Sequence, residues 1–144
     1  MCHHMRVVLD TNVLVAASRS SRGASYAIVS ELPSPKFEIA LTIPLYMEYQ
    51  DALTRPETMG KRYTVDEAIR FTRYLCSIAH QQTIYFLWRP WLKDPKDDMV
   101  LEAAFASQSQ FIVTHNLKDF ADKGIEEHFG ICPVSPKQFL ETII

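Results

Sequence analysis

Short apolar segments alternate with helix-like segments along the whole chain, and this alternation restricts the fold more than any other feature. Met5–Asp10, Phe37–Thr42 and Phe111–Thr114 are short runs of mostly apolar residues. Runs of this kind are typical of parallel strands that are buried on both faces. Longer segments with helical periodicity separate them. The sequence therefore predicts a three-layer α/β domain, in which helices cover both faces of a parallel sheet.

Proline, capping residues and periodicity set the expected boundaries of the elements. The segment Thr64-Val-Asp-Glu67 is a capping box that opens a helix. Asp94-Pro95 and Ser135-Pro136 each place a capping side chain before a proline at the first helical position. Thr83–Trp88 is β-branched and aromatic, which favours a strand. The other expected elements are strands at Met5–Asp10, Phe37–Thr42, Phe111–Thr114 and Ile131–Val134, and helices at Thr11–Ser18, Ala24–Leu32 and Ile43–Leu53.

The composition is that of an ordinary globular domain and excludes several classes of protein. The chain has 144 residues, 47% hydrophobic and 22% charged, which suits one domain over 1–144 with residues 1–4 as an extension. No apolar run approaches the roughly 20 residues of a membrane span, and we expect no secretory segment. Cys2, Cys76 and Cys132 are widely spaced and contain no CxxC pair, which favours a reducing, cytoplasmic compartment.

Acidic side chains follow the first two predicted strands. Asp10 ends the first strand, where it is either the N-cap of the next helix or a site residue. Glu48 lies in the helix after the second strand, at the border of its apolar stripe, and a solvent-facing side chain is its simpler interpretation. In open parallel sheets, ligands bind beyond the carboxyl ends of the strands. Both acids are therefore candidates for one site.

Further polar side chains follow the later strands. Asp97 and Asp98 open a predicted buried helix, where acids also stabilise the helix dipole. A helix cap needs only one of Asp94, Asp97 and Asp98. The repulsion between three such acids must be offset by solvent or by a cation. Asn116 and Asp119 follow the fourth strand, and each alone is most simply a turn former.

The joint pattern is more specific than any of its members. Acids or Asn/Asp pairs come after four strands, and in a parallel sheet these positions share one edge. Carboxylate and amide oxygens without His or Cys partners suit a hard cation, Mg²⁺ or Mn²⁺. Such a cation commonly serves phosphodiester cleavage by an activated water. The net charge of −2 excludes only a protein that coats nucleic acid by bulk positive charge.

Four segments, taken in order, resemble the PIN-domain family of metal-dependent ribonucleases, in particular the small prokaryotic VapC-type toxins. They are VVLDTNVLV (Val7–Val15), LYMEYQDAL around Glu48, DPKDDMVLEAA (Asp94–Ala104) and FIVTHNLKDF (Phe111–Phe120). The resemblance implies a PIN-like fold with a parallel five-stranded sheet of order 3-2-1-4-5. It also implies an endoribonuclease that cleaves RNA with Mg²⁺ or Mn²⁺, a toxin with a cognate antitoxin, and a homodimer.

The resemblance also implies a set of metal-binding and catalytic residues. Asp10, Glu48 and Asp98 match the acidic triad of the family. Asp98 is preferred because its 16-residue distance to Thr114 suits the family spacing, and Asp97 stays an alternative. On this interpretation Asp10 and Asp98 bind the metal directly, and Glu48 binds metal or positions the water.

The fourth acidic position departs from the family pattern. Asn116 stands where relatives often carry an acid, so either Asp119 completes the metal site or Asn116 orients a water. Thr11 and Asn12 resemble the polar pair beside the first acid of the family. Thr114 resembles the hydroxyl that faces its active site.

Two alternatives to a nuclease stay open at the level of the sequence. A phosphatase of the haloacid-dehalogenase type needs a second acid two residues after the first, where this chain has Asn12. A catalytically weak scaffold that binds RNA or protein is consistent with Asn116. If the site is a nuclease site, Arg19 and Arg22 are candidate contacts for the RNA phosphates.

Overall fold

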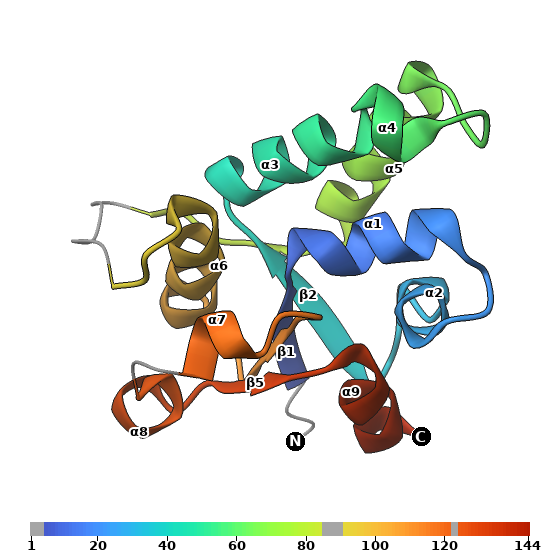
Figure 1. Ribbon diagram of the computed structural model, residues 1–144. Coiled ribbons are helices and arrows are strands. Elements are labelled where there is room, and N and C mark those ends of the chain that lie inside the picture. The colour runs from blue at the N-terminus through green and yellow to red at the C-terminus, as the bar shows by residue number, and fades with distance from the viewer. Residues whose placement is uncertain (1–4, 85–90, 122–123) are drawn as a thin grey trace.

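The computed structural model describes residues 5–84, 91–121 and 124–144. Strands and helices alternate along it as the sequence predicts (Figure 1). In this part of the chain, five parallel strands form one sheet of order β3-β2-β1-β4-β5, which confirms the expected α/β architecture and strand order. The strands are β1 (Met5–Leu9), β2 (Phe37–Leu41), β3 (His80–Gln81), β4 (Phe111–Val113) and β5 (Cys132–Val134).

The main helices begin at the capping residues that the sequence indicates. The Thr64 side chain accepts a hydrogen bond from the Glu67 amide, and the Glu67 side chain accepts one from the Thr64 amide. Ser135 and Gln138 form a second capping box. The helices are α1 (Thr11–Arg19), α2 (Ala24–Ser30), α3 (Ile43–Leu53), α4 (Pro56–Met59), α5 (Val65–Ile78), α6 (Pro95–Ala106), α7 (Lys118–Ala121), α8 (Ile125–Phe129) and α9 (Pro136–Ile143).

The third strand is shorter than predicted and lies earlier in the chain. The expected strand Thr83–Trp88 is wrong at Thr83 and Ile84, which are irregular, and its residues 85–88 lie outside the described residues. β3 instead pairs with Ala40 and Leu41, and the Gln82 amide donates to the Leu41 carbonyl at 2.8 Å. Because β2 then turns into α3, its pairing edge ends there. The end of the partner strand therefore overrides the local β-propensity of the following residues.

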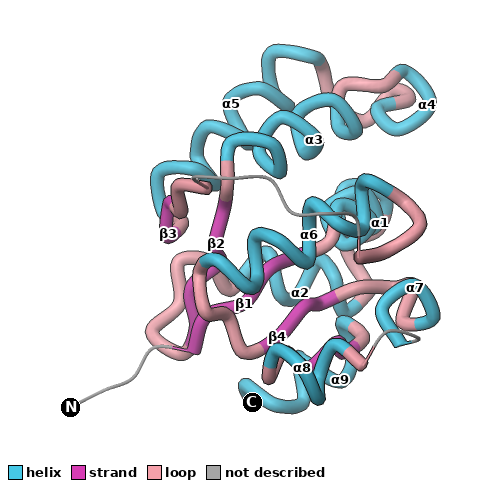
Figure 2. Tube along the Cα trace, turned by 90° about the vertical axis from the view of Figure 1, so that its left-hand side faces the viewer, coloured by secondary structure: helices cyan, strands magenta, loops and turns pink. Residues whose placement is uncertain are grey.

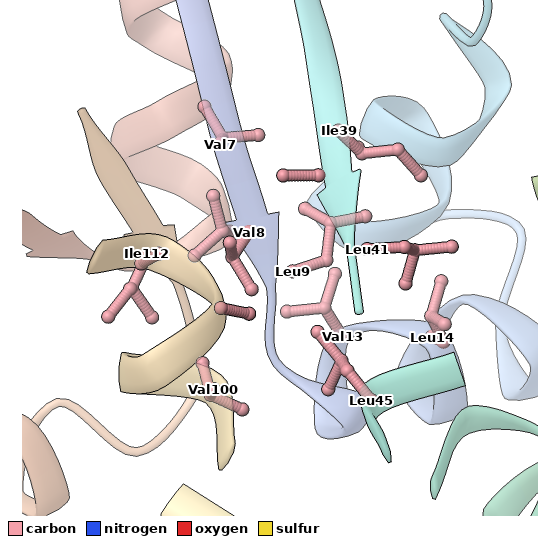
Figure 3. Packing of buried hydrophobic residues seen from close by; sticks show 14 of the residues in the cluster. Val7, Val8, Leu9, Val13, Leu14, Ile39, Leu41, Leu45, Val100 and Ile112 are labelled. Atoms are coloured by element: carbon pink, nitrogen blue, oxygen red, sulfur yellow. The ribbon is translucent and has the colours of Figure 1, made fainter. Parts of the chain in front are cut away.

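The sheet core is apolar and continuous with the helices around it. Val7, Val8 and Leu9 of β1 are each 0% exposed, as expected for the central strand of a parallel sheet. Figure 3 shows them among side chains from the neighbouring strands and from α1, α3 and α6. This packing holds the carboxyl end of β1 rigidly between β2 and β4.

The helices form one layer on each face of the sheet. α6 contacts β1, β2 and β4, and Figure 1 shows α1, α2 and α9 on the opposite side. Phe139 of α9 meets Phe37 of β2 edge to face, with ring centroids 5.1 Å apart. α3 and α5 pack together and extend beyond the carboxyl end of β2 (Figure 2). No helix within 5–84, 91–121 or 124–144 is long and apolar enough to cross a membrane.

Candidate active site

Four carboxylates from four different elements act on one another near the carboxyl ends of the central strands. Asp10 follows β1, Glu48 lies in α3, Asp97 lies in the first turn of α6, and Asp119 lies in α7 after β4. Burial is the largest cause that raises the pKa of Asp10, and the charges of Asp119 and Glu48 act in the same direction. The pKa of Asp97 is likewise raised first by burial and then by the charges of Asp119 and Asp10. The fold thus brings Asp10, Glu48, Asp97 and Asp119 towards one place, with Asp98 acting on its neighbour Asp97 as well.

Asp10 is the buried member of this group. It is 8% exposed and occupies the N-cap position of α1, yet its side chain makes no capping hydrogen bond. One carboxylate oxygen instead accepts a 2.7 Å hydrogen bond from the Thr114 hydroxyl. Burial raises the pKa of Asp10 against the opposing effects of that bond and of a hydrogen bond from the Thr11 backbone. The bond to Thr114 comes from outside α1, so capping alone does not account for this side chain.

Thr114 follows β4, and its hydroxyl makes three hydrogen bonds that connect β4 to the start of α1. Its single proton goes to Asp10, while its oxygen accepts from the Asn116 amide at 3.0 Å and from Asn12 Nδ2 at 3.4 Å. The Asn12 side-chain oxygen accepts in turn from the amide of His115 at 3.2 Å. A hydroxyl has one donor and two acceptor sites, so all three are in use. This network fixes the orientation of the Asp10 carboxylate.

The three acids at the start of α6 have different partners. Asp94 caps the helix by accepting from the Lys96 amide at 2.9 Å. Asp98 Oδ1 accepts from the amides of Trp91 and Leu92 at 3.0 and 2.7 Å, which ties down the segment before the helix. Partial burial, and then the charges of Asp119 and Asp10, raise the pKa of Asp97 to about 7. In this turn, the charges of Asp119 and Asp10 thus raise the pKa of Asp97 in addition to its burial.

Glu48 faces α6 rather than solvent. Its side chain is 12% exposed, and its carboxylate lies 3.8 Å from the ammonium of Lys96. α3 and α6 are in contact along this side. The simpler interpretation of Glu48 as an outward-facing helix residue is therefore not what the structure shows.

The loop after β4 carries the remaining polar side chains. Asn116 and Asp119 are both exposed, and the Asp119 amide donates to the Asn116 carbonyl at 3.0 Å. The two residues are therefore close together, and Asp119 supplies the carboxylate on this side of the site. Thr11 begins α1 next to Asp10 and is partly buried.

The two arginines proposed as phosphate contacts follow from the far end of α1, not from its first turn beside Asp10. Arg19 is the last residue of α1, a helix that begins beside Asp10, and a nine-residue helix places its ends about 12 Å apart. Arg22 is exposed in the loop that follows. In the described part of the chain, the cation that forms an ion pair with one of the four acids is Lys96, whose partner is Glu48.

Sequence reasoning missed two side chains at this edge of the sheet. Tyr49 is 1% exposed, and its hydroxyl donates to the carbonyl of Leu9, just before Asp10. Burial, and then the charge of Asp10, raise the pKa of Tyr49 well above its ordinary value. The second is Ser25, whose buried hydroxyl lies 2.8 Å from His115 Nε2. A buried tyrosine usually needs a partner for its hydroxyl, and this was the available signal for Tyr49.

The donor set suits a hard divalent cation. The four acids supply only oxygen ligands, and burial followed by the charges of the neighbouring carboxylates raises the pKa of both Asp10 and Asp97. Within the described residues, no three His, Cys, Asp or Glu side chains stand close enough to form a ready-made metal cage. Mg²⁺ commonly binds through one or two carboxylates and keeps several waters. The residues therefore fit an open site of that kind.

Comparisons with known proteins give a family match and similar solved structures. A sequence profile of the family described as PIN domain matches residues 6–118. A search of curated proteins gives no match. One similar solved chain belongs to the crystal structure of VapBC2 from Rickettsia felis bound to a DNA fragment from their promoter. It has a TM-score of 0.59 and 16% sequence identity, and the match covers 91% of this chain and 98% of that one. At this identity the likeness shows the shared fold alone.

Proposed function

The chain belongs to the PIN-domain family, and from this premise we propose that it is a metal-dependent endoribonuclease. The observation that carries the proposal is the convergence of Asp10, Glu48, Asp97 and Asp119 beyond the carboxyl ends of the central strands. Repelling carboxylates at one place are costly unless a cation offsets them. A protein that only needed helix caps would not collect acids from four separate elements.

Asp10 and Asp97 are the proposed direct ligands of Mg²⁺ or Mn²⁺. Glu48 and Asp119 complete the acidic edge, as further ligands or by holding a water. A bound divalent cation supplies an activated water and neutralises charge on the phosphate in phosphodiester hydrolysis. Asp98 is the family-based preference for the third acid, but its oxygen already serves two backbone amides, which supports Asp97.

The polar neighbours hold the acids in place. Thr114 donates to one oxygen of Asp10, and this hydrogen bond orients the carboxylate that would meet the cation. Asn12 and the Asn116 amide both donate to the Thr114 hydroxyl, so that its proton is directed to Asp10. Lys96 balances the charge of Glu48.

We further propose that the protein is the toxin of a toxin–antitoxin pair, with RNA as its substrate, a cognate antitoxin as its partner and a cytoplasmic location. The fold shared with a chain of the VapBC2 structure, over almost its full length, supports this. The proposal predicts that expression in a bacterial host arrests growth, and that Asp10→Asn abolishes the arrest at an equal protein level. Arrest by both proteins would contradict the toxin assignment.

The nuclease proposal is tested by RNA cleavage with purified protein. The wild type should cleave a mixed-sequence RNA in Mn²⁺ or Mg²⁺ and should lose activity in EDTA, and Asp10→Asn should be inactive under both conditions. Equal cleavage by wild type and Asp10→Asn, or cleavage in EDTA, would overturn the proposal. Retained RNA binding without Mn²⁺ binding would favour the non-catalytic scaffold. A phospho-aspartate trapped at Asp10 would favour the phosphatase.

A further inference from the structure

Tyr49 connects the two elements that carry Glu48 and Asp10. It follows Glu48 in α3 and is buried, and its hydroxyl donates to the carbonyl of Leu9, the last residue of β1. That carbonyl belongs to the peptide group that leads into Asp10. The contact therefore joins the helix of one site acid directly to the main chain of another.

The position of the Leu9 carbonyl explains why a side chain is needed there. The Asp10 amide donates to the Val113 carbonyl of β4 at 2.9 Å. Because the peptide group is planar and trans, its carbonyl points the other way, towards β2. The register of β1 with β2 runs only from Met5–Phe37 to Val7–Ile39. A buried carbonyl without a partner is costly, and the Tyr49 hydroxyl supplies the donor at this point.

We propose that Tyr49 is a positioning residue, which holds the peptide of Asp10 and the α3 segment of Glu48 at the separation needed for a divalent cation. This inference rests on the proposed metal-dependent function. With Val113 on one side and Tyr49 on the other, both ends of the Leu9–Asp10 peptide group are held. The Thr114 bond then sets the carboxylate itself, so that backbone and side chain of Asp10 are fixed independently.

A second tyrosine in contact with α3 provides a matched control. The Tyr63 hydroxyl donates to the carbonyl of Leu53 at 2.7 Å, at the opposite end of α3 from its first turn. Tyr49→Phe and Tyr63→Phe each remove one hydroxyl and one bond to a main-chain carbonyl. Both keep the aromatic ring, so both should retain the fold with a lower Tm. Only the Tyr49 bond touches the peptide of a proposed ligand.

The experiment measures Mn²⁺ binding to the RNA-free proteins by calorimetry, together with kcat and KM for RNA. Partners that orient metal ligands typically contribute about 10- to 100-fold to metal affinity or activity. Tyr49→Phe should therefore weaken Mn²⁺ binding at least about 10-fold and lower kcat at subsaturating Mn²⁺, with KM for RNA unchanged. Tyr63→Phe should bind Mn²⁺ and cleave RNA as the wild type does.

Two results would overturn the inference while leaving the nuclease proposal in place. One is Mn²⁺ binding by Tyr49→Phe equal to that of the wild type. The other is an equal loss of Mn²⁺ binding in Tyr63→Phe, which would show general destabilisation rather than positioning. A wild type that neither binds Mn²⁺ nor cleaves RNA would instead overturn the proposed function, and this inference with it.

Discussion

The candidate site has a strand side and a helix side, and they differ in how far the protein itself holds them in place. The strand side consists of Asp10, Asn12 and Thr114. Its carboxylate is buried and hydrogen-bonded, and its peptide group is held on both sides. The helix side consists of Glu48, Asp97 and Asp119. Within the described residues, the ion pair of this side is that of Glu48 with Lys96 at 3.8 Å, and Asp119 is exposed.

This difference indicates that the two sides contribute differently to cation binding. The strand side presents one ligand in a fixed place before any metal arrives. The helix side collects negative charge, and the pKa of Asp97 rises to about 7 as burial and the charges of Asp119 and Asp10 disfavour its ionised form. A divalent cation would stabilise those carboxylates. The helix side is therefore the part of the site that we expect a cation to organise.

The largest expected effect compares one acid from each side. Asp10→Asn should lower kcat by at least about 100-fold, because a direct ligand should matter no less than the partners that orient it. Asp119→Asn should lower kcat by less than about 10-fold, since its side chain is exposed and is held in place less firmly than that of Asp10. Cleavage rates at saturating Mn²⁺ measure both. Equal losses would remove the distinction between the two sides.

The next effect distinguishes the two neighbouring acids of α6. Asp97→Asn should weaken Mn²⁺ binding and cleavage at least about 10-fold, because its carboxylate lies among the site charges. Asp98→Asn should leave both nearly unchanged, since an asparagine oxygen still accepts from the amides of Trp91 and Leu92. Calorimetry with Mn²⁺ and a cleavage assay measure the pair. The reverse ranking would assign the metal to Asp98.

The strand side was the more predictable part of the site. β1 is a short apolar run that ends in an acid, and that pattern alone placed Asp10 at the sheet edge. The partner of Asp10 was less predictable, because Thr114 is 104 residues away. The sequence indicates that both residues follow strands. It contains no information on which oxygen the hydroxyl reaches, since that depends on the packing of β4 beside β1.

The helix side shows where sequence reasoning stops. Asp97 and Asp98 are consecutive, and consecutive helical residues point about 100° apart around the axis. Which one faces the site depends on the rotation of α6, set by the packing of Val100 and Leu101. Short helices such as α7, which carries Asp119, have too few residues for a periodic signal. The sequence therefore identified Asp119 as a candidate but did not predict the helix that carries it.

A smaller effect tests whether the Thr114 network holds the strand side. Thr114→Val keeps the side-chain shape but leaves Asn12, Asp10 and the Asn116 amide without their shared partner. It should weaken Mn²⁺ binding by about 10-fold and lower the free energy of unfolding by about 1–3 kcal/mol.

Thr72→Val is the matched control for this change. Thr72 is also fully buried, but its hydroxyl donates to the Ile69 carbonyl within α5, outside the site. It should leave Mn²⁺ binding as in the wild type, which calorimetry would show. Equal Mn²⁺ affinity in Thr114→Val and Thr72→Val would mean that Asp10 needs no orientation by Thr114.

The smallest expected effect is the pH dependence of the helix side in EDTA. Asp97 binds its proton more tightly in the folded chain, where its pKa is about 7, than in an unfolded chain, where an aspartate has its ordinary pKa of 3.8. The unfolded chain therefore loses this proton first, so the contribution of Asp97 makes stability fall as pH rises from about 4 to about 7. In Mn²⁺ the pH dependence of stability reverses, because the affinity for the cation rises as the carboxylate loses the competing proton.

Thermal unfolding at about pH 5 and pH 7.5, with EDTA or Mn²⁺, should show both trends in the wild type and weaker ones in Asp97→Asn. If Asp97→Asn kept the full pH dependence, the titrating group would lie on the strand side, where the pKa of Asp10 is also raised.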